Sequence, residues 1–202
     1  MTIRVVLFDF GGVLVQGQNF YARSAWAQRL GLEPEALARH VFESELAERA
    51  IVGELPVEGM WVQLGGELGL DAGESRRLMN DFFRGDDLNV AMLGLARSLE
   101  GEYELAILSN AWSNAREAFV ERFGLDELFD EMIISAEVGL AKPDPQIYHL
   151  TVRRLGVEPE EILFIDDRLE NIEAAREAGF HAVHYRNNVQ TIAEVRALLE
   201  RA

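Results

Sequence analysis

The sequence predicts an α/β protein, with a Rossmann-like parallel sheet of five strands, helices on both faces, and an inserted small all-helical domain. Three observations predict this fold. An apolar strand-like run opens the chain, residues 17–85 show only helical patterning, and strands and helices alternate from residue 86 onward. Alternating strands and helices imply right-handed crossovers and a parallel sheet covered on both faces. We therefore assign residues 1–16 and 86–202 to the α/β core and residues 17–85 to the helical domain.

The first strand is followed by one carboxylate and two glycines. Residues Ile3 to Leu14 read IRVVLFDFGGVL, so Asp9 lies where the apolar run ends, just before Gly11 and Gly12. Open α/β sheets bind ligands at the carboxyl ends of their strands. We therefore expect Asp9 in a functional site, although a carboxylate that only caps the turn would explain it too. Both faces of this strand are apolar, which favours a central place in the sheet.

Residues 17–85 contain periodic apolar positions typical of helices and no convincing strand. Asp71 with Glu74 predicts a capping box at the start of one helix. Glycines 31, 53 and 69 separate the helices. The predicted helices contain Ala22–Leu30, Leu37–Leu46 entered through Pro34, Val57–Leu68 and Ala72–Phe83. The candidate lining residues of a ligand site are Gln16, Asn19, Tyr21, Trp26 and Trp61, and for each the alternative is core packing or an ordinary surface position.

From Leu88 the helices and strands alternate with short turns between them. The run to Leu99 predicts a helix that leads back into the core. The later predicted strands are Tyr103–Leu108, Met132–Ser135, Ile162–Ile165 and Ala182–Tyr185, and the later predicted helices are Ala111–Phe123, Pro145–Leu155, Arg168–Ala178 and Val189–Leu199.

Composition excludes several kinds of site and partner. The formal net charge of −16 leaves no basic surface for a nucleic-acid backbone or an anionic membrane. No apolar stretch approaches the ~20 residues of a membrane span, so we expect a cytoplasmic protein. The absence of cysteine excludes disulfides, thiolate zinc sites and a cysteine nucleophile. A metal would therefore have oxygen or imidazole ligands, and oxygen ligands suit Mg²⁺.

Only one of the 19 basic residues is a lysine, Lys142. It lies in the turn sequence GLAKPDP, between Gly139 and Pro143. A lysine kept where arginine serves everywhere else indicates a need for a compact point charge rather than a planar guanidinium. The alternative is an ordinary surface lysine.

Two further strand ends carry polar residues. Ser109 and Asn110 follow one apolar run. Their hydroxyl and main-chain N–H groups could hold an anion at a helix start, or they could simply cap that helix.

Asp166 and Asp167 follow another apolar run, and two adjacent carboxylates repel each other unless a cation joins them. Asn171 follows Asp167 by about one helical turn. The alternative is a capping box between Asp167 and Glu170.

Taken in chain order, Asp9, Ser109, Lys142 and the pair Asp166 and Asp167 resemble the four motifs of the haloacid dehalogenase-like (HAD) hydrolases over essentially the whole chain. The segment from Gly139 to Tyr185 is most similar to subfamily IA variant 3, the branch with the phosphatase domain of soluble epoxide hydrolase. The resemblance implies a helical cap at residues 17–85 that closes over the site and carries specificity. The adjacent acids distinguish the chain from true haloacid dehalogenases, whose fourth motif binds no metal.

The resemblance also implies a role for each residue. Asp9 would be the nucleophile that forms an aspartyl-phosphate, and Lys142 would neutralise charge on it and on the phosphoryl group. The remaining implied roles are metal ligands at Asp9, the Gly11 carbonyl and Asp167; phosphate contacts at Ser109, Asn110 and Gly12; and supporting positions at Asp166 and Asn171. We therefore expect a Mg²⁺-dependent phosphatase acting on a small phosphorylated metabolite.

One position departs from the family pattern. Most phosphatases of the superfamily carry an acid–base aspartate two residues after the nucleophile, where this chain has Gly11. Acid–base help contributes typically 10²–10⁴-fold to rate. A catalytically weak or non-catalytic binding protein of the same fold is therefore the alternative, followed by a metal-independent haloacid dehalogenase.

Overall fold

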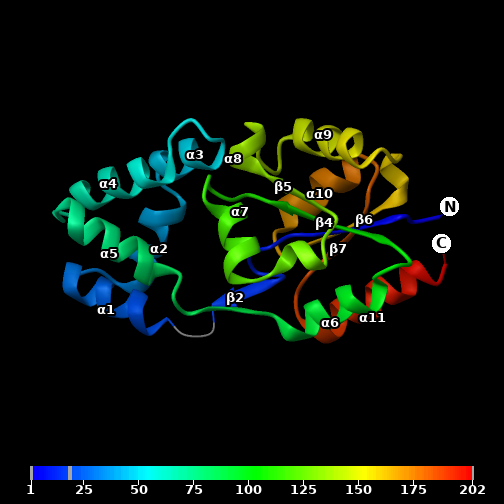
Figure 1. The fold of residues 1–202 in the computed structure, drawn as a ribbon, viewed down its shortest axis with the longest axis horizontal. Helices are drawn as coiled ribbons and strands as arrows, with labels where there is room; N and C mark the ends of the chain where they lie inside the picture. The colour runs from blue at the N-terminus through cyan, green and yellow to red at the C-terminus, as the bar shows by residue number, and fades with distance from the viewer. Residues whose placement is uncertain (1, 18–19, 202) are drawn as a thin grey trace.

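The computed structural model describes residues 2–17 and 20–201. The molecule is elongated, with a helical module at one end and the sheet-bearing core, including both ends of the described chain, at the other (Figure 1). Among the described residues, no helix is both long enough and apolar enough to cross a membrane.

The core contains the predicted five-stranded parallel sheet, in the order β5-β4-β1-β6-β7. The strand β1 (Val5–Phe8) is central, as predicted, and every one of its side chains is buried. Phe8, its last residue, pairs with Ile107 of β4 and Ile165 of β6. This register brings the carboxyl ends of three strands side by side. The other strands are β4 (Glu104–Ser109), β5 (Glu131–Ile134), β6 (Ile162–Asp166) and β7 (His181–His184).

Helices cover both faces of the sheet (Figure 1). On one face, α6 (Val90–Leu99) and α11 (Asn188–Leu199) pack with Val6 and Phe8 into one apolar cluster. On the other, α9 (Pro145–Leu155) and α10 (Leu169–Glu177) pack on Val5 and Leu7. Successive residues of a strand point to opposite faces, so the continuous apolar run of β1 supplies both clusters.

A second, two-stranded sheet lies where the chain leaves and re-enters the core. In it β2 (Val15–Gly17) pairs antiparallel with β3 (Asp86–Leu88). The sequence analysis predicted neither strand. Three residues are too few to show alternation, and the two aspartates that begin β3 disfavour a strand by propensity.

The helical module contains five helices among the described residues, with a core of its own around Trp61 and Leu78. The predicted capping box is present: Glu74 N–H donates to the Asp71 side chain, and Asp71 N–H to that of Glu74. The predicted second helix is present and begins at Pro34, but its continuation to Leu46 is wrong. Ser44 interrupts it and caps the next helix by accepting from the Ala47 N–H. The helices are α1 (Tyr21–Leu30), α2 (Pro34–Phe42), α3 (Glu45–Ile51), α4 (Val57–Glu67) and α5 (Ala72–Phe82).

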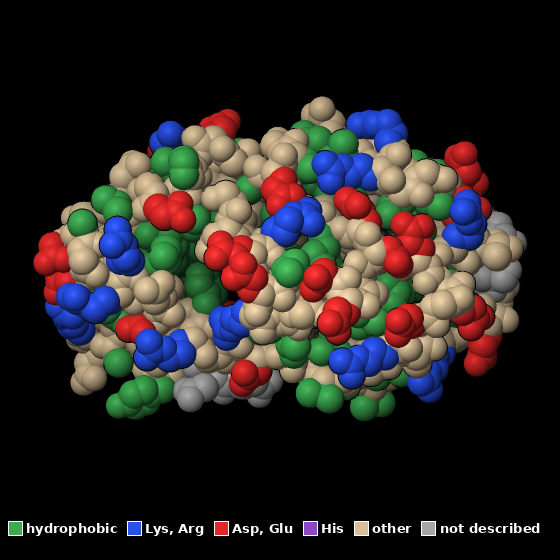
Figure 2. Space-filling view, in the orientation of Figure 1, with side chains coloured by type: hydrophobic (Ala, Val, Ile, Leu, Met, Phe, Trp, Pro, Cys, Tyr) green, Lys and Arg blue, Asp and Glu red, His purple; other side chains and the backbone are tan. Residues whose placement is uncertain are grey.

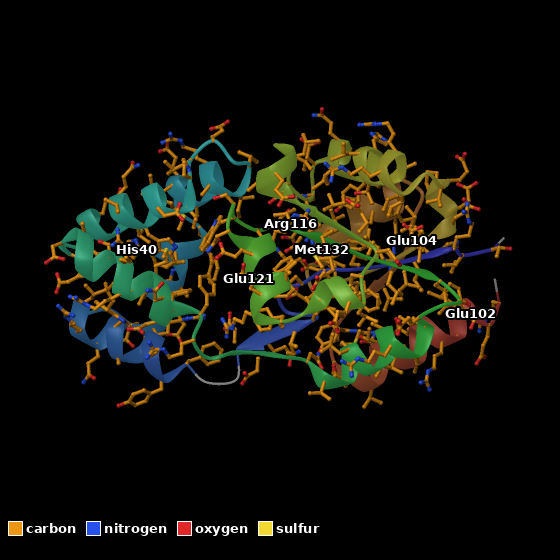
Figure 3. The ribbon with its side chains drawn as sticks, viewed as in Figure 1. His40, Glu102, Glu104, Arg116, Glu121 and Met132 are labelled. Atoms are coloured by element: carbon orange, nitrogen blue, oxygen red, sulfur yellow. The ribbon has the colours of Figure 1, made fainter. Side chains whose placement is uncertain are left out.

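The segment after β4 also differs from the prediction. The helix expected from Ala111 begins only at α7 (Ala115–Glu117) and continues as a π-helix, Ala118–Arg122. Arg116 anchors it, donating to the Met132 carbonyl of β5 and, through two N–H groups, to the Glu137 carboxylate (Figure 3). The remaining short helices are α8 (Ser135–Val138) and two 3-10 turns, Leu125–Glu127 and Pro159–Glu161.

The packing of α4 against α5 depends on one of two adjacent glycines. A methyl group on Gly65 would lie 2.6 Å from Ser75 Cβ, whereas one on the exposed Gly66 would meet nothing within 4 Å. We expect Gly65→Ala to lower the free energy of unfolding by about 1–3 kcal/mol through overpacking. Gly66→Ala should leave it unchanged or raise it by up to about 1 kcal/mol. Chemical denaturation of both variants measures the difference, and equal effects would contradict this packing.

Candidate active site

Three carboxylates meet at the carboxyl edge of the sheet. Asp9 follows β1, Asp166 ends β6 and Asp167 follows it; one oxygen of each lies within 4.8 Å of the others. Asp9 and Asp166 are buried, and Asp167 is exposed. Parallel pairing of β1 with β6 brings together acids that are more than 150 positions apart in the chain.

Lys142 lies between these acids with its side chain completely buried. Its ammonium donates to Asp9 Oδ1 at 2.8 Å, to Asp166 Oδ2 at 2.7 Å and to the Leu108 carbonyl at 2.8 Å. An ammonium has three N–H groups, so these acceptors use all of them. The alternative of an ordinary surface lysine is therefore wrong.

Two asparagines hold this arrangement in place. Asn110 donates to the Lys142 carbonyl and accepts from the Lys142 N–H. The amide oxygen and one amide N–H of Asn110 are thus engaged with the lysine backbone. A phosphate contact from Asn110 would use its second amide N–H or its main-chain N–H. Asn171 donates to Asp166, at 3.0 Å from each carboxylate oxygen, and so contacts the buried acid rather than Asp167.

The structure excludes the capping alternatives for these strand ends. No helix begins at Ser109 or Asn110, because α7 begins at Ala115. Arg168, not Asp167, is the residue that immediately precedes α10. The Arg168 N–H donates to the Asp166 side chain, so Asp167 does not cap this helix. Asp9 does accept from the N–H of Phe10 next to it, yet the same oxygen also pairs with Lys142, so its place is not explained by a turn alone.

Glycines let the backbone approach the acids. Gly12 has a φ of +82°, and a Cβ there would lie 2.6 Å from the Asp167 Cγ. A side chain at this position would therefore displace the carboxylate. At Gly11, in contrast, a Cβ would meet no atom within 4 Å, so packing does not require glycine there.

Burial and mutual repulsion shift the pKa values of the site. Burial raises the pKa of Asp9 to about 7, against the opposing charge of Lys142. Burial and the neighbouring Asp166 raise the pKa of Asp167. For Lys142, burial acts to lower the pKa, but the carboxylates of Asp9 and Asp166 outweigh it and raise the pKa above the ordinary lysine value.

The residues present fit a divalent cation. Three ionised carboxylates and one ammonium leave two uncompensated negative charges, which is the charge that one Mg²⁺ neutralises. Carboxylate oxygens are the ligands this hard cation prefers. A cation would also remove the repulsion that raises the pKa of Asp167.

A cleft of about 490 Å³ adjoins the acids and extends toward the helical module. Gly11, Gly12, Ser109 and Asn110 line it at the sheet edge. Figure 2 shows this face hollowed between the module and the core, with hydrophobic side chains in the hollow. The π-helix contributes Ala118, Phe119 and Arg122 to the wall. Such distortions of regular helix frequently occur at functional sites.

Four of the residues predicted to line a ligand site, those within the described part of the chain, do not line this cleft. Trp61 is buried in the module core, Trp26 donates to Asp81, Tyr21 is exposed, and Gln16 donates to the Tyr185 hydroxyl. Asn19 lies outside the described residues. The lining residues missed by sequence reasoning include Arg23, Phe42, Phe83, Trp112 and Arg122. They come from separate helices and loops, so no spacing in the sequence connects them.

The sequence is similar to known phosphatases along its whole length. It is 27% identical over 202 residues to a sesquiterpene phosphatase of Aspergillus oryzae, covering 98% of this chain and 97% of that protein. It is 28% identical over 208 residues to the D-ribitol-5-phosphate phosphatase of Bacteroides thetaiotaomicron, covering 98% of both. Against mouse bifunctional epoxide hydrolase 2 it is 26% identical over 215 residues, covering 96% of this chain and 38% of that protein.

Solved structures share the fold. A HAD-family enzyme of Bacteroides thetaiotaomicron, crystallised with magnesium and inorganic phosphate, matches with a TM-score of 0.74 at 20% identity, over 91% of this chain and 94% of that one. At this identity the match shows the fold alone. The sequence model of the haloacid dehalogenase-like hydrolases matches residues 3–179.

Replacing Asp167 should weaken magnesium binding. A cation that binds only the folded state raises its stability, so Mg²⁺ should raise the melting temperature of the wild type more than that of Asp167→Asn. Titration at pH 8, above the pKa of about 7 for Asp9, avoids competition with a proton. Asp126→Asn, at an exposed acid outside the cluster, is the control and should respond like the wild type. Equal shifts in all three proteins would remove Asp167 from the site.

Proposed function

We propose a function from the premise that this chain belongs to the haloacid dehalogenase-like hydrolase family. It is a hydrolase of that family, and its resemblance to the epoxide hydrolase branch is confirmed by the mouse relative. Within the family, we propose a magnesium-dependent phosphatase that acts on a small phosphorylated metabolite, with Asp9 as the nucleophile.

The observation that carries the proposal is the ammonium of Lys142 held between Asp9 and Asp166, with Asp167 beside them. A buried carboxylate next to a fixed positive charge and a cation site suits attack on an electron-rich phosphoryl group. Asp9 Oδ1 accepts from both Lys142 and Phe10, while the described residues give Oδ2 no hydrogen bond. Oδ2 is therefore the oxygen we assign to the attack.

The reaction would proceed in two displacements. Asp9 Oδ2 forms a bond to phosphorus while the bond from phosphorus to the ester oxygen breaks, which leaves an aspartyl-phosphate and an alkoxide that takes a proton from solvent water. A second water then forms a bond to the same phosphorus while the bond to Asp9 Oδ2 breaks. This step releases phosphate, which keeps the protons of the water or passes them to solvent, and it restores the Asp9 carboxylate. Lys142 offsets negative charge on Asp9 and on the phosphoryl group in both steps, and the Ser109 hydroxyl and the Asn110 N–H hold phosphoryl oxygens. The Gly12 N–H donates to the Val15 carbonyl at 2.8 Å, so it does not supply the phosphate contact expected at Gly12.

Magnesium fits the acids of this site. Asp9, Asp167 and the Gly11 carbonyl would hold it, and when bound it would neutralise charge on the phosphoryl oxygens. Asp166 and Asn171 act through other residues, because Asp166 orients Lys142 and Asn171 orients Asp166.

The helical module is proposed as a cap that covers the site. Residues 17–85 form this cap and residues 1–16 and 86–202 the catalytic core. The cleft lies between them, and its lining combines residues of both. The relatives named above are a sesquiterpene phosphatase and a D-ribitol-5-phosphate phosphatase, which supports phosphate ester hydrolysis as the shared chemistry. Substrate choice would then depend on the residues that differ between these proteins.

A non-catalytic binding protein is the second candidate, and Gly11 is the observation that favours it. The family's usual acid–base aspartate is missing there, although the space for one is open. A haloacid dehalogenase is less well supported, because the charge of the acid cluster calls for a cation.

We expect that arginine at position 142 cannot take over the function of the lysine. The side chain is fully buried and all three of its N–H groups have acceptors, so a larger planar group would displace the acids although it keeps the charge. We expect Lys142→Arg to lower kcat by about 100-fold, the loss typical of one transition-state donor. Arg97→Lys, an exposed exchange on α6, is the control. Wild-type activity in a folded Lys142→Arg protein would contradict the role of the ammonium.

The leaving group should control the rate. Without an aspartate at position 11, departure of a basic alkoxide receives little acid help, so kcat/KM should fall steeply across aryl phosphates as the leaving-group pKa rises. The aspartyl-phosphate should also hydrolyse slowly and accumulate. Phosphate release by purified protein in Mg²⁺ measures the slope. Asp9→Asn should abolish it; if the wild type releases no phosphate, or Asp9→Asn releases as much, the catalytic proposal is wrong.

The same series tests position 11 directly. Gly11→Asp should fit, because nothing lies within 4 Å of a Cβ there. It should flatten the dependence on leaving-group pKa and raise rates for poor leaving groups by about 100-fold or more, whereas Gly11→Ala should not. If the wild type already cleaves sugar phosphates as fast as activated esters, another group supplies the proton.

A further inference from the structure

The cleft beside the acids has mainly aromatic and aliphatic walls. Phe10, Phe42, Phe83, Trp112 and Phe119 all line it, and they come from both the core and the helical module. Phe10 directly follows the nucleophile, and its ring packs on that of Phe119 with centroids 3.9 Å apart. The apolar wall therefore begins one residue from the reacting carboxylate.

Several polar side chains of the cleft already have partners within the protein. Arg122 donates to the Phe83 and Asp86 carbonyls, and Arg23 donates to the Phe82 carbonyl and pairs with Asp86. The Asn110 amide is engaged with Lys142. Among the buried donors of the wall, Arg23 Nε and Trp112 Nε1 have no hydrogen-bond partner in the described structure. A polyhydroxylated substrate would bury more hydroxyl groups than these two donors can satisfy, against walls that are mainly apolar, which is unfavourable.

Apolar surface continues from the site to the outside of the molecule. Phe42 is 44% exposed and Phe20 is 50% exposed, and both line the cleft. The lining also includes Ser109, Gly11 and Gly12, and Gly12 lies against Asp167. The cleft thus combines a part suited to a phosphate and a cation with walls that are mainly apolar. Its volume of about 490 Å³ falls within the range of about 300–1,000 Å³ for small-molecule sites.

We infer that the phosphatase selects monophosphate esters of apolar alcohols or phenols, whose hydrocarbon part lies in this cleft, over sugar phosphates. The inference rests on the proposed function. Burial of each methylene group in the cleft removes apolar surface from water, while the phosphate end is the same for every substrate.

A series of 4-alkylphenyl phosphates tests the inference, because the alkyl chain lengthens while the leaving-group pKa stays nearly constant. We expect kcat/KM in Mg²⁺ to rise about two- to fourfold for each added methylene until the cleft is filled. Phe42→Ser should flatten this rise. Val62→Ser is the matched control, since Val62 lies in the same module, is similarly exposed (49%) and does not line the cleft. It should keep the wild-type slope.

Different outcomes separate the inference from the proposed function. Phosphate release that does not depend on alkyl length, or the same slope in Phe42→Ser as in the wild type, would overturn the inference and leave the phosphatase intact. If no ester releases phosphate, the proposed function fails, and binding of n-alkylphosphonates, measured by calorimetry in Mg²⁺, decides the inference. Affinity that rises with chain length and exceeds that of a polyhydroxylated phosphonate supports it; equal affinities overturn it.

Discussion

The buried ammonium of Lys142 is the interaction on which the site depends. It is the meeting point of the turn before α9, the end of β4, the end of β1 and the end of β6, through Leu108, Asp9 and Asp166. Buried ions are expensive to desolvate, and an apolar cluster of equal volume would often be as stable or more so. Removing the lysine would leave two buried carboxylates uncompensated. The buried charges at the sheet edge are therefore explained by the chemistry of the site rather than by a gain in the stability of the fold.

Chemistry and selectivity are divided between two kinds of surface. The charged groups lie on strand ends and adjoining turns, where backbone pairing holds them rigidly. The cleft walls come from the helical module, the π-helix and the loop after β4, and are mainly apolar. Changes in the apolar wall can alter which ester fits without removing the ion pairs, because none of its aromatic side chains takes part in them. This division suits a family in which related chains hydrolyse different phosphate esters.

Local patterns predicted most elements of the fold. Apolar runs identified all five strands of the main sheet, because a strand buried on both faces has no polar positions. The predicted bounds of α9, Pro145–Leu155, agree with the structure, in which proline occupies the first turn and Gly156 follows the helix in a left-handed conformation. Prediction failed where local signals were short or conflicting. The strands β2 and β3 are three residues each, the break at Ser44 interrupts a continuous helical pattern, and the π-helix has no recognised periodicity in the sequence.

The sequence by itself determined which chemical groups are available: one lysine, three aspartates at strand ends, no cysteine, and a glycine where an acid is usual. Residue type and position along a strand carry that information locally. Only the tertiary structure decided that Lys142 is buried between Asp9 and Asp166, that Asn110 holds the lysine backbone, and that aromatic residues from distant segments form one cleft. These are contacts between segments far apart in the chain, which depend on strand order and helix packing, and no local spacing records them.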